Sequence, residues 1–160
     1  VKRTTPAIDE DAVEAAAKLL ASSKRPLISV GGGANEASPE VRQLGTLLDG
    51  GWPALMARNR ELALAARALL CETLQVAPPA PASMIGSIAS VLLPRAAADS
   101  PVARLDHEAL MGWFRERGVE TWFYPWPCAG GKLIRVSAQL YNELPDYRRL
   151  AGLLREAMGG

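Results

Sequence analysis

The chain has 160 residues, 49% of them hydrophobic, which is enough to bury the core of one or two small domains. Its 18 basic residues nearly balance its 17 acidic residues, and no arginine-lysine cluster stands out, so nothing favours a nucleic-acid or acidic-membrane partner. No apolar run is long enough to span a bilayer, and the sequence does not open with an apolar signal segment. We therefore expect a cytoplasmic protein without a membrane partner.

The first 44 residues are expected to form a helix, a short strand and a second helix. Apolar residues recur at helical spacing over residues 8–20, with acidic residues in the first turn. The apolar run 27–30 has the length of a short strand, and three glycines at 31–33 predict a tight turn after it. The second helix begins at Ser38, whose hydroxyl is a favourable N-cap and which is followed by a proline. The order of this N-terminal fragment is αβα.

Residues 45–160 predict an α/β domain of the α+β two-layer kind. Helices are expected at 52–75, 105–117 and 145–158, and strands at 87–93, 119–124 and 132–139. In the first of these helices, Arg58, Arg60 and Arg67 lie largely off the apolar stripe. Gly118 stops the second helix, and the last two strands pair across the loop between them. We expect a small, mainly antiparallel sheet with helices on one face.

The stretch 133–142 is the most informative part of the chain for function. If it forms a strand, Ile134 and Val136 point to one side while Arg135 and Ser137 point to the other. An arginine held on a rigid strand presents a planar fork of donors that suits a carboxylate or a phosphate. Arg135 is therefore a candidate substrate clamp. The alternative is a surface salt bridge, which spacing alone favours.

Other residues with distinctive chemistry give weaker signals. Trp126 lies between two prolines, where it either lines the mouth of a pocket or covers the edge of the sheet. His107, the single histidine, stands early in a helix without a nucleophile beside it, and we expect it to be solvated. Cys71 and Cys128 are too few for a disulfide framework and have no metal-ligand spacing, so we expect reduced cysteines and no metal.

A series of different short motifs lies along residues 45–158, in a characteristic order and spacing. They are Gly50-Gly51-Trp52-Pro53, Arg58-Asn59-Arg60-Glu61-Leu62-Ala63-Leu64, Ser83-Met84-Ile85-Gly86-Ser87, Pro125-Trp126-Pro127, Arg135-Val136-Ser137 and Tyr141-Asn142. Together they resemble the C-terminal small domain of class V aminotransferases, pyridoxal-phosphate enzymes of fold type I, and within these the isopenicillin N epimerase-like branch.

The resemblance implies a role for the arginine of the R-x-S motif. In that family this arginine binds the α-carboxylate of the substrate, and Arg135 occupies its position. We add Trp126, Ser137, Tyr141 and Asn142 as candidate pocket-lining residues. The resemblance therefore implies an amino-acid-like carboxylate as ligand.

The N-terminal fragment resembles a different family. Its Lys-Arg-Pro-Leu-Ile phrase at 24–28, followed by Gly-Gly-Gly-Ala at 31–34, is similar to the opening of the central domain of thiamine-diphosphate-dependent enzymes. The similarity covers about a third of such a domain. We therefore predict two parts, 1–44 and 45–160, with a join between residues 41 and 51.

Neither resemblance brings a cofactor site with it. Pyridoxal-phosphate chemistry needs a lysine for the Schiff base and an acid for the pyridinium nitrogen, and in fold type I both come from the large domain. None of the four lysines, Lys2, Lys18, Lys24 and Lys132, resembles that lysine in context, and Lys132 is expected on the face opposite Arg135. The central domain of the thiamine-diphosphate enzymes likewise does not hold its cofactor. We expect no catalytic residue and no bound cofactor in this chain.

The expected function is therefore that of a substrate-carboxylate-binding small domain that is inactive alone. Its expected partner is a large domain or a second copy in a homodimer. The alternatives are a non-catalytic interaction module, a chimeric or truncated fragment, and a partial thiamine-diphosphate-dependent enzyme.

Overall fold

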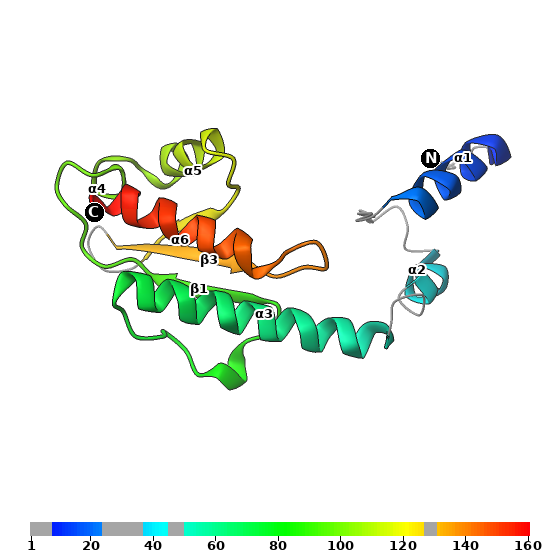
Figure 1. Ribbon diagram of the computed structural model, residues 1–160, viewed down its shortest axis with the longest axis horizontal. Coiled ribbons are helices and arrows are strands. Elements are labelled where there is room, and N and C mark those ends of the chain that lie inside the picture. Colours follow the sequence, from blue (N-terminus) through cyan, green and yellow to red (C-terminus); the bar gives the residue numbers. More distant parts are fainter. Residues whose placement is uncertain (1–7, 24–36, 45–49, 127–130) are drawn as a thin grey trace, which may run out of the picture. The chain divides into compact units, whose positions relative to one another are not determined.

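A computed structural model describes residues 8–23, 37–44, 50–126 and 131–160 (Figure 1). The chain divides into two compact units, Val1–Ser38 and Pro39–Gly160. The predicted strand 27–30 and the glycine turn 31–33 lie outside the described residues, and so does Cys128.

The described part of the N-terminal unit is dominated by one helix, α1 (Glu10–Ser22). Its N-cap is Asp9, whose carboxylate accepts a hydrogen bond from the Ala12 N–H at 3.0 Å. Glu10 and Asp11 add negative charge to the first turn, which the helix dipole favours. None of the α1 side chains is buried. Among the described residues, the features that stabilise α1 are its caps and the charges of its first turn.

The C-terminal unit contains the sheet and the remaining helices. In chain order its elements are α2 (Ser38–Leu44), α3 (Gly51–Leu74), the 3-10 turn η3 (Ala82–Met84), β1 (Ile88–Leu92), α4 (Pro101–Arg104), α5 (His107–Glu116), β2 (Trp122–Pro125), β3 (Lys132–Ser137) and α6 (Leu144–Met158). The three long helices and three strands expected between residues 52 and 158 are all present. The sequence did not indicate α4, which Ser100 starts by capping the Ala103 N–H at 3.3 Å.

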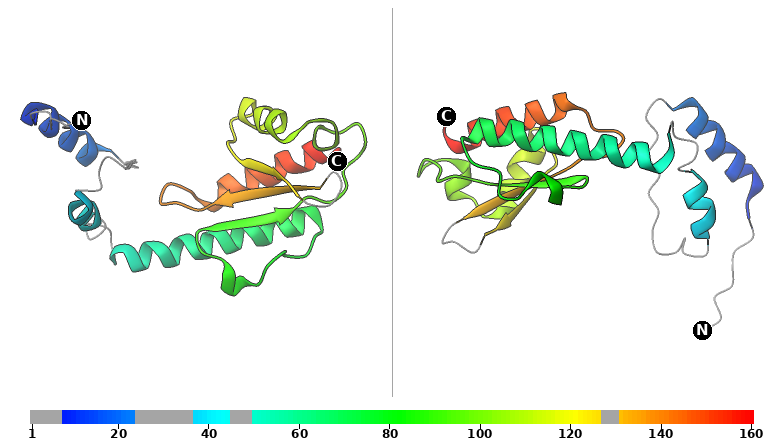
Figure 2. Two further views of the ribbon diagram at one scale, coloured as in Figure 1. Left: turned by 180° about the vertical axis from the view of Figure 1, so that it is seen from behind. Right: turned by 90° about the horizontal axis from the view of Figure 1, so that it is seen from below.

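The sheet is antiparallel, and its strand order is β1-β3-β2. In the central strand β3, Ile134 and Val136 are buried, and they face the same side as Phe123 of β2. Helices α3, α5 and α6 pack on this side, with α3 beside α6 (Figure 2). The expected arrangement of helices on one face of a small antiparallel sheet is confirmed.

The core lies between the three long helices and the sheet. Its largest fully buried side chains are Phe114, Phe123, Leu70, Leu110, Ile134, Leu154 and Val91. The rings of Phe114 and Phe123 meet with their centroids 5.1 Å apart, which joins α5 to β2. Cys71 is also buried here, and this burial raises the pKa of its thiol, opposed by the charge of Arg67. A raised pKa keeps the thiol protonated and therefore unreactive.

The arginines of α3 hold loops against the helix. Arg67 was expected off the buried stripe, but only 6% of it is exposed, and its Nη1 donates to the Ala80 carbonyl at 2.7 Å. Arg60 donates to the carbonyls of Ala82 and Ile85 at 3.0 and 3.1 Å. The expectation for Arg67 was wrong because its alkyl stem packs inward while the guanidinium reaches a loop carbonyl.

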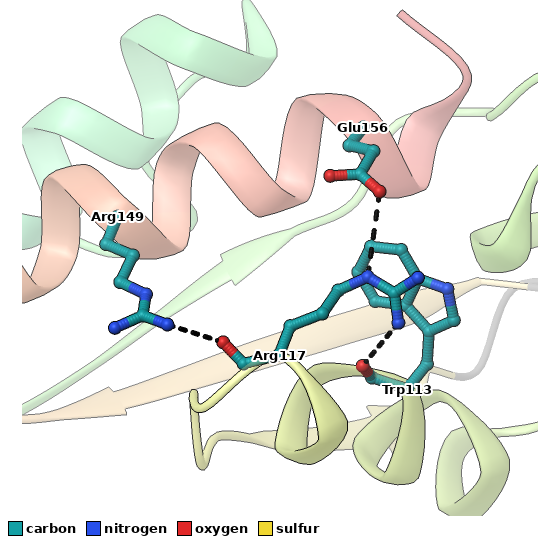
Figure 3. A network of polar contacts seen from close by, with 4 residues as sticks. All are labelled: Trp113, Arg117, Arg149 and Glu156. Carbon is teal, nitrogen blue, oxygen red and sulfur yellow. Dashed lines mark hydrogen bonds and ion pairs between the residues drawn. The ribbon is translucent and has the colours of Figure 1, made fainter.

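The end of α5 is tied to α6 by a small polar network (Figure 3). The Arg117 guanidinium lies 3.7 Å from the centroid of the Trp113 ring, and its Nε lies 3.6 Å from Glu156. Arg149 of α6 donates to the Arg117 carbonyl at 2.7 Å. The chain then turns at Gly118, where a φ of +72° provides the predicted stop.

Candidate functional site

Arg135 lies on the face of the sheet that faces away from the helices. In the register of the sheet it is paired with Ser90 of β1 on one side and Trp122 of β2 on the other. The left view of Figure 2 shows the strands in front of α3 and α6, so that this face points toward the viewer. Half of Trp122 is exposed, whereas its neighbour Phe123, on the helix side, is 1% exposed. Arg135 is therefore central on an open, partly apolar sheet face.

The guanidinium of Arg135 rests against aromatic rings rather than carboxylates. Its central carbon lies 5.1 Å from the ring centroid of Tyr124 and 6.0 Å from that of Trp122. The Nε atom is buried and has no hydrogen-bond partner among the residues described. Arg135 takes no part in the ion pairs Lys18–Glu14 and Arg117–Glu156.

The contacts of Arg135 with aromatic rings differ from those expected of a surface salt bridge, the alternative role for this residue. A buried donor without a partner is costly, by about 1–3 kcal/mol. The aromatic rings offset the positive charge but do not accept the Nε hydrogen in a directed bond. Because the Nε atom is buried, an anion would form a hydrogen bond with it only after a neighbouring side chain moved aside.

A hollow of about 430 Å³ opens at the edge of the sheet, by the end of β3, and its lining combines Arg135 with residues of the helix side, Val136, Tyr147 and Leu150. Its lining includes Arg135, Ser137, Tyr141 and Asn142, so three of the four candidate pocket residues lie at the same hollow as the arginine. Trp126 is not in that lining, and its backbone N–H instead donates to the Gly131 carbonyl at 2.9 Å, beyond the end of β2.

Two acidic residues are also part of the lining of the hollow. Glu120 and Asp146 belong to its lining together with Arg135. Asp146 also helps to begin α6, because its carboxylate accepts the Glu143 N–H at 2.9 Å. Both signs of charge are therefore available around one cavity, which suits a zwitterion such as an amino acid.

The loop between β3 and α6 is held in place from α3. Arg58 donates to the carbonyls of Gln139 and Asn142, at 3.1 and 2.9 Å. The Asn142 side chain closes the loop by accepting the Gln139 N–H at 3.1 Å. Tyr141, between them, is thereby presented to the hollow. The Arg-Asn-Arg motif thus has a local structural role in positioning the pocket.

Tyr147 of α6 is hydrogen-bonded to the end of β3. Its hydroxyl donates to the Ser137 carbonyl at 2.7 Å. Burial, assisted by the charges of Asp146 and Tyr141 and opposed by Arg58, raises the pKa of Tyr147 to about 12. The hydroxyl therefore stays protonated at neutral pH and keeps donating this bond.

Two residues of the site did not stand out as candidates in the sequence. Trp122 lines the hollow, and its ring is stacked with that of Tyr124, with centroids 6.4 Å apart and planes tilted by 18°. Their i, i+2 spacing already placed both on one strand face. Their proximity to Arg135 depends on the pairing register of β2 and β3, which the spacing does not contain.

The described lysines do not fit a pyridoxal-phosphate site. Lys132 donates to the Val102 carbonyl at 2.8 Å, on the helix side of the sheet and opposite Arg135. Lys18 is paired with Glu14 in α1 at 2.7 Å. His107 is exposed at the start of α5, as expected. The part of the chain that the structure covers contains no group of three potential metal-ligating His, Cys, Asp or Glu side chains.

Comparisons with known proteins add no assignment. No protein-family model matches this chain, and no curated protein sequence matches it. Within the described ranges, no helix combines the length and the apolar character needed to cross a bilayer.

Proposed function

We propose that residues 45–158 form the small domain of a class V aminotransferase-like enzyme of the isopenicillin N epimerase-like branch, in which Arg135 binds the α-carboxylate of an amino acid. The observation that carries the proposal is Arg135, a residue that lines an open hollow and whose buried Nε has no hydrogen-bond partner among the described residues. A carboxylate would satisfy this donor and the fork beside it with charge-assisted hydrogen bonds.

The rest of the hollow supports an amino acid rather than a simple anion. Glu120 and Asp146 provide negative charge for the ammonium group of a zwitterion, while Arg135 provides the positive charge. Ser137, Tyr141 and Asn142 supply further polar groups around the cavity. Because the described lysines lie away from this hollow, we assign no Schiff-base role to them and derive no step through pyridoxal phosphate. That chemistry would require a large domain.

The second candidate function is a non-catalytic interaction module. The observation that favours it is the exposure of Trp122 and Ile88 on the open sheet face, at 50% and 48%. An apolar face of this kind is also suited to contact with another protein chain. The two functions differ in whether Arg135 binds a small carboxylate.

The proposal is tested by titrating the protein with L-alanine and following backbone NMR signals of residues 135–142. A lone arginine-carboxylate contact is weak, so we expect saturable binding with a Kd of roughly 1 mM or above. Arg135→Gln removes the charge and the fork, and we expect it to weaken binding at least about tenfold, or roughly 1.4 kcal/mol.

Arg104→Gln is the matched control, because Arg104 is exposed on α4 and does not line the hollow. It should leave the Kd unchanged. Equal binding by the wild type and the Arg135→Gln variant, or the absence of binding by either, would contradict the proposal and favour the interaction module.

A further inference from the structure

The open sheet face carries a second feature beside Arg135, the pair of aromatic rings on β2. The guanidinium carbon and the two ring centroids form a triangle with sides of 5.1, 6.0 and 6.4 Å. The charge therefore lies to one side of the ring pair and not between the rings. One small ligand can reach the guanidinium and a ring at the same time.

The rings are arranged as a surface for a flat group. Their planes are tilted by only 18°, and their centroids are 6.4 Å apart. A flat group between two parallel rings needs a separation of about 7 Å, twice the contact distance of carbon atoms. The observed separation is smaller than this, so a ligand would have to displace Trp122, whose side chain is half exposed and outside the core cluster.

The role of the rings is not explained by folding. Phe123, between them in the strand, points to the helices and is fully buried in the core. Trp122 remains half exposed on the other face and lines the hollow with Arg135. A large exposed aromatic ring next to a cation with an unused donor is the arrangement expected of a recognition surface.

We infer that Trp122 and Tyr124 determine specificity at this site, and that its ligand carries a flat aromatic or conjugated group close to the carboxylate bound by Arg135. The inference rests on the proposed function, because it takes the carboxylate on Arg135 as its anchor. Stacking adds a preference beyond the burial of apolar area, worth about three- to tenfold in affinity.

The test compares two carboxylates of similar size, 3-phenylpropionate and 3-cyclohexylpropionate, by NMR titration of the full chain. Both carry the same charge, but the saturated ring is more apolar and is not flat. Burial of area alone therefore favours the cyclohexyl compound, whereas stacking favours the phenyl compound. We expect the phenyl compound to bind about three- to tenfold more tightly.

Single substitutions show which side chains cause the preference for the phenyl compound. Trp122→Leu and Tyr124→Leu, made separately, keep an apolar side chain but remove a ring. In each variant the affinities for the phenyl and cyclohexyl compounds should become nearly equal. Trp126→Leu is the control, because Trp126 is also exposed but lies outside the hollow, and it should keep the full preference. Circular dichroism verifies that each variant is folded.

The outcomes separate this inference from the proposed function. If Arg135→Gln weakens both compounds while the wild type binds them equally, the proposed function stands and the specificity role is overturned. If the phenyl preference survives in both leucine variants, the role of the rings is also overturned. If neither compound binds, or Arg135→Gln changes nothing, both claims fail, and the open face is then better explained as a contact surface for another protein.

Discussion

At the scale of single residues, strand alternation predicted the side of β3 on which Arg135 lies but not its surroundings. The spacing placed Arg135 opposite Ile134, and the structure has Ile134 buried and Arg135 on the open face. The alternation could not reveal that the guanidinium rests against Trp122 and Tyr124, because those contacts depend on the register of another strand. The alternation of one strand predicts the sheet face on which a side chain lies, whereas the contacts of that side chain depend on how the strands pair.

Tyr147 gives a prediction for stability at high pH. Its pKa rises from 10.0 to about 12 in the folded protein, so between these values the folded state keeps a proton that the unfolded state has lost. The free energy of unfolding should therefore fall as the pH rises from 10 to 12. At neutral pH this contribution is fully present.

Tyr147→Phe removes both the titration and the hydrogen bond to Ser137. We expect this variant to be about 1 kcal/mol less stable than the wild type at pH 7. The difference between the two proteins, measured by urea unfolding, should shrink toward pH 12. A difference that stays constant over that range would show that Tyr147 is not responsible for the pH dependence.

At the scale of elements, the presence and order of the long helices and strands followed from periodicity and from stop signals such as Gly118, but the strand expected at 119–124 begins only at Trp122. Helix α4 was not indicated, because it is only one turn long and depends on the cap from Ser100. The pairing of β1 with β3 was not indicated either, since their residues are far apart in the chain. Contacts such as that between Arg58 and Asn142 likewise belong to the tertiary fold.

Two glycines at α5 give opposite predictions for the same substitution. Gly118 has φ +72°, and a Cβ there would lie 2.9 Å from Arg149 Nη2, so Gly118→Ala should destabilise the protein by about 1 kcal/mol or more. Gly112, within α5, has open space around its Cα, so Gly112→Ala should stabilise the protein by roughly 0.5–1 kcal/mol.

Urea unfolding of both variants measures these changes. The opposite signs make each variant the control for the other, because both add one methyl group to a glycine at or near the same helix. If Gly118→Ala were as stable as Gly112→Ala, the positive φ at Gly118 would not be the constraint that ends α5.

At the scale of the whole molecule, the hydrophobic core found among the described residues lies in the C-terminal unit. The buried residues of the hydrophobic cluster extend from Ala66 to Ala157, whereas none of the side chains of α1 is buried. We predict that this cluster alone is sufficient for the stability of the C-terminal unit. The resemblance of the first 44 residues to another family remains a prediction, because the strand 27–30 lies outside the described residues.

Removal of residues 1–38 tests this independence. The four tryptophans lie between residues 52 and 126, so tryptophan fluorescence reports only on the C-terminal unit. We expect the shortened chain to unfold at the same urea concentration as the full chain, within about 0.5 kcal/mol. A loss of several kcal/mol would show that the two units share a core.

The central claim is that Arg135 holds a carboxylate on the open face of the sheet, and the NMR signal of its own Nε–H group tests this most directly. This hydrogen has no partner in the free protein, whereas the Nε–H of Arg60 already donates to Ile85 at 3.1 Å and is the internal control. On addition of L-alanine at constant ionic strength, we predict a saturable downfield shift of the Arg135 signal and no shift of the Arg60 signal. An Arg135 signal that stays fixed, or moves only in parallel with that of Arg60, would contradict the claim.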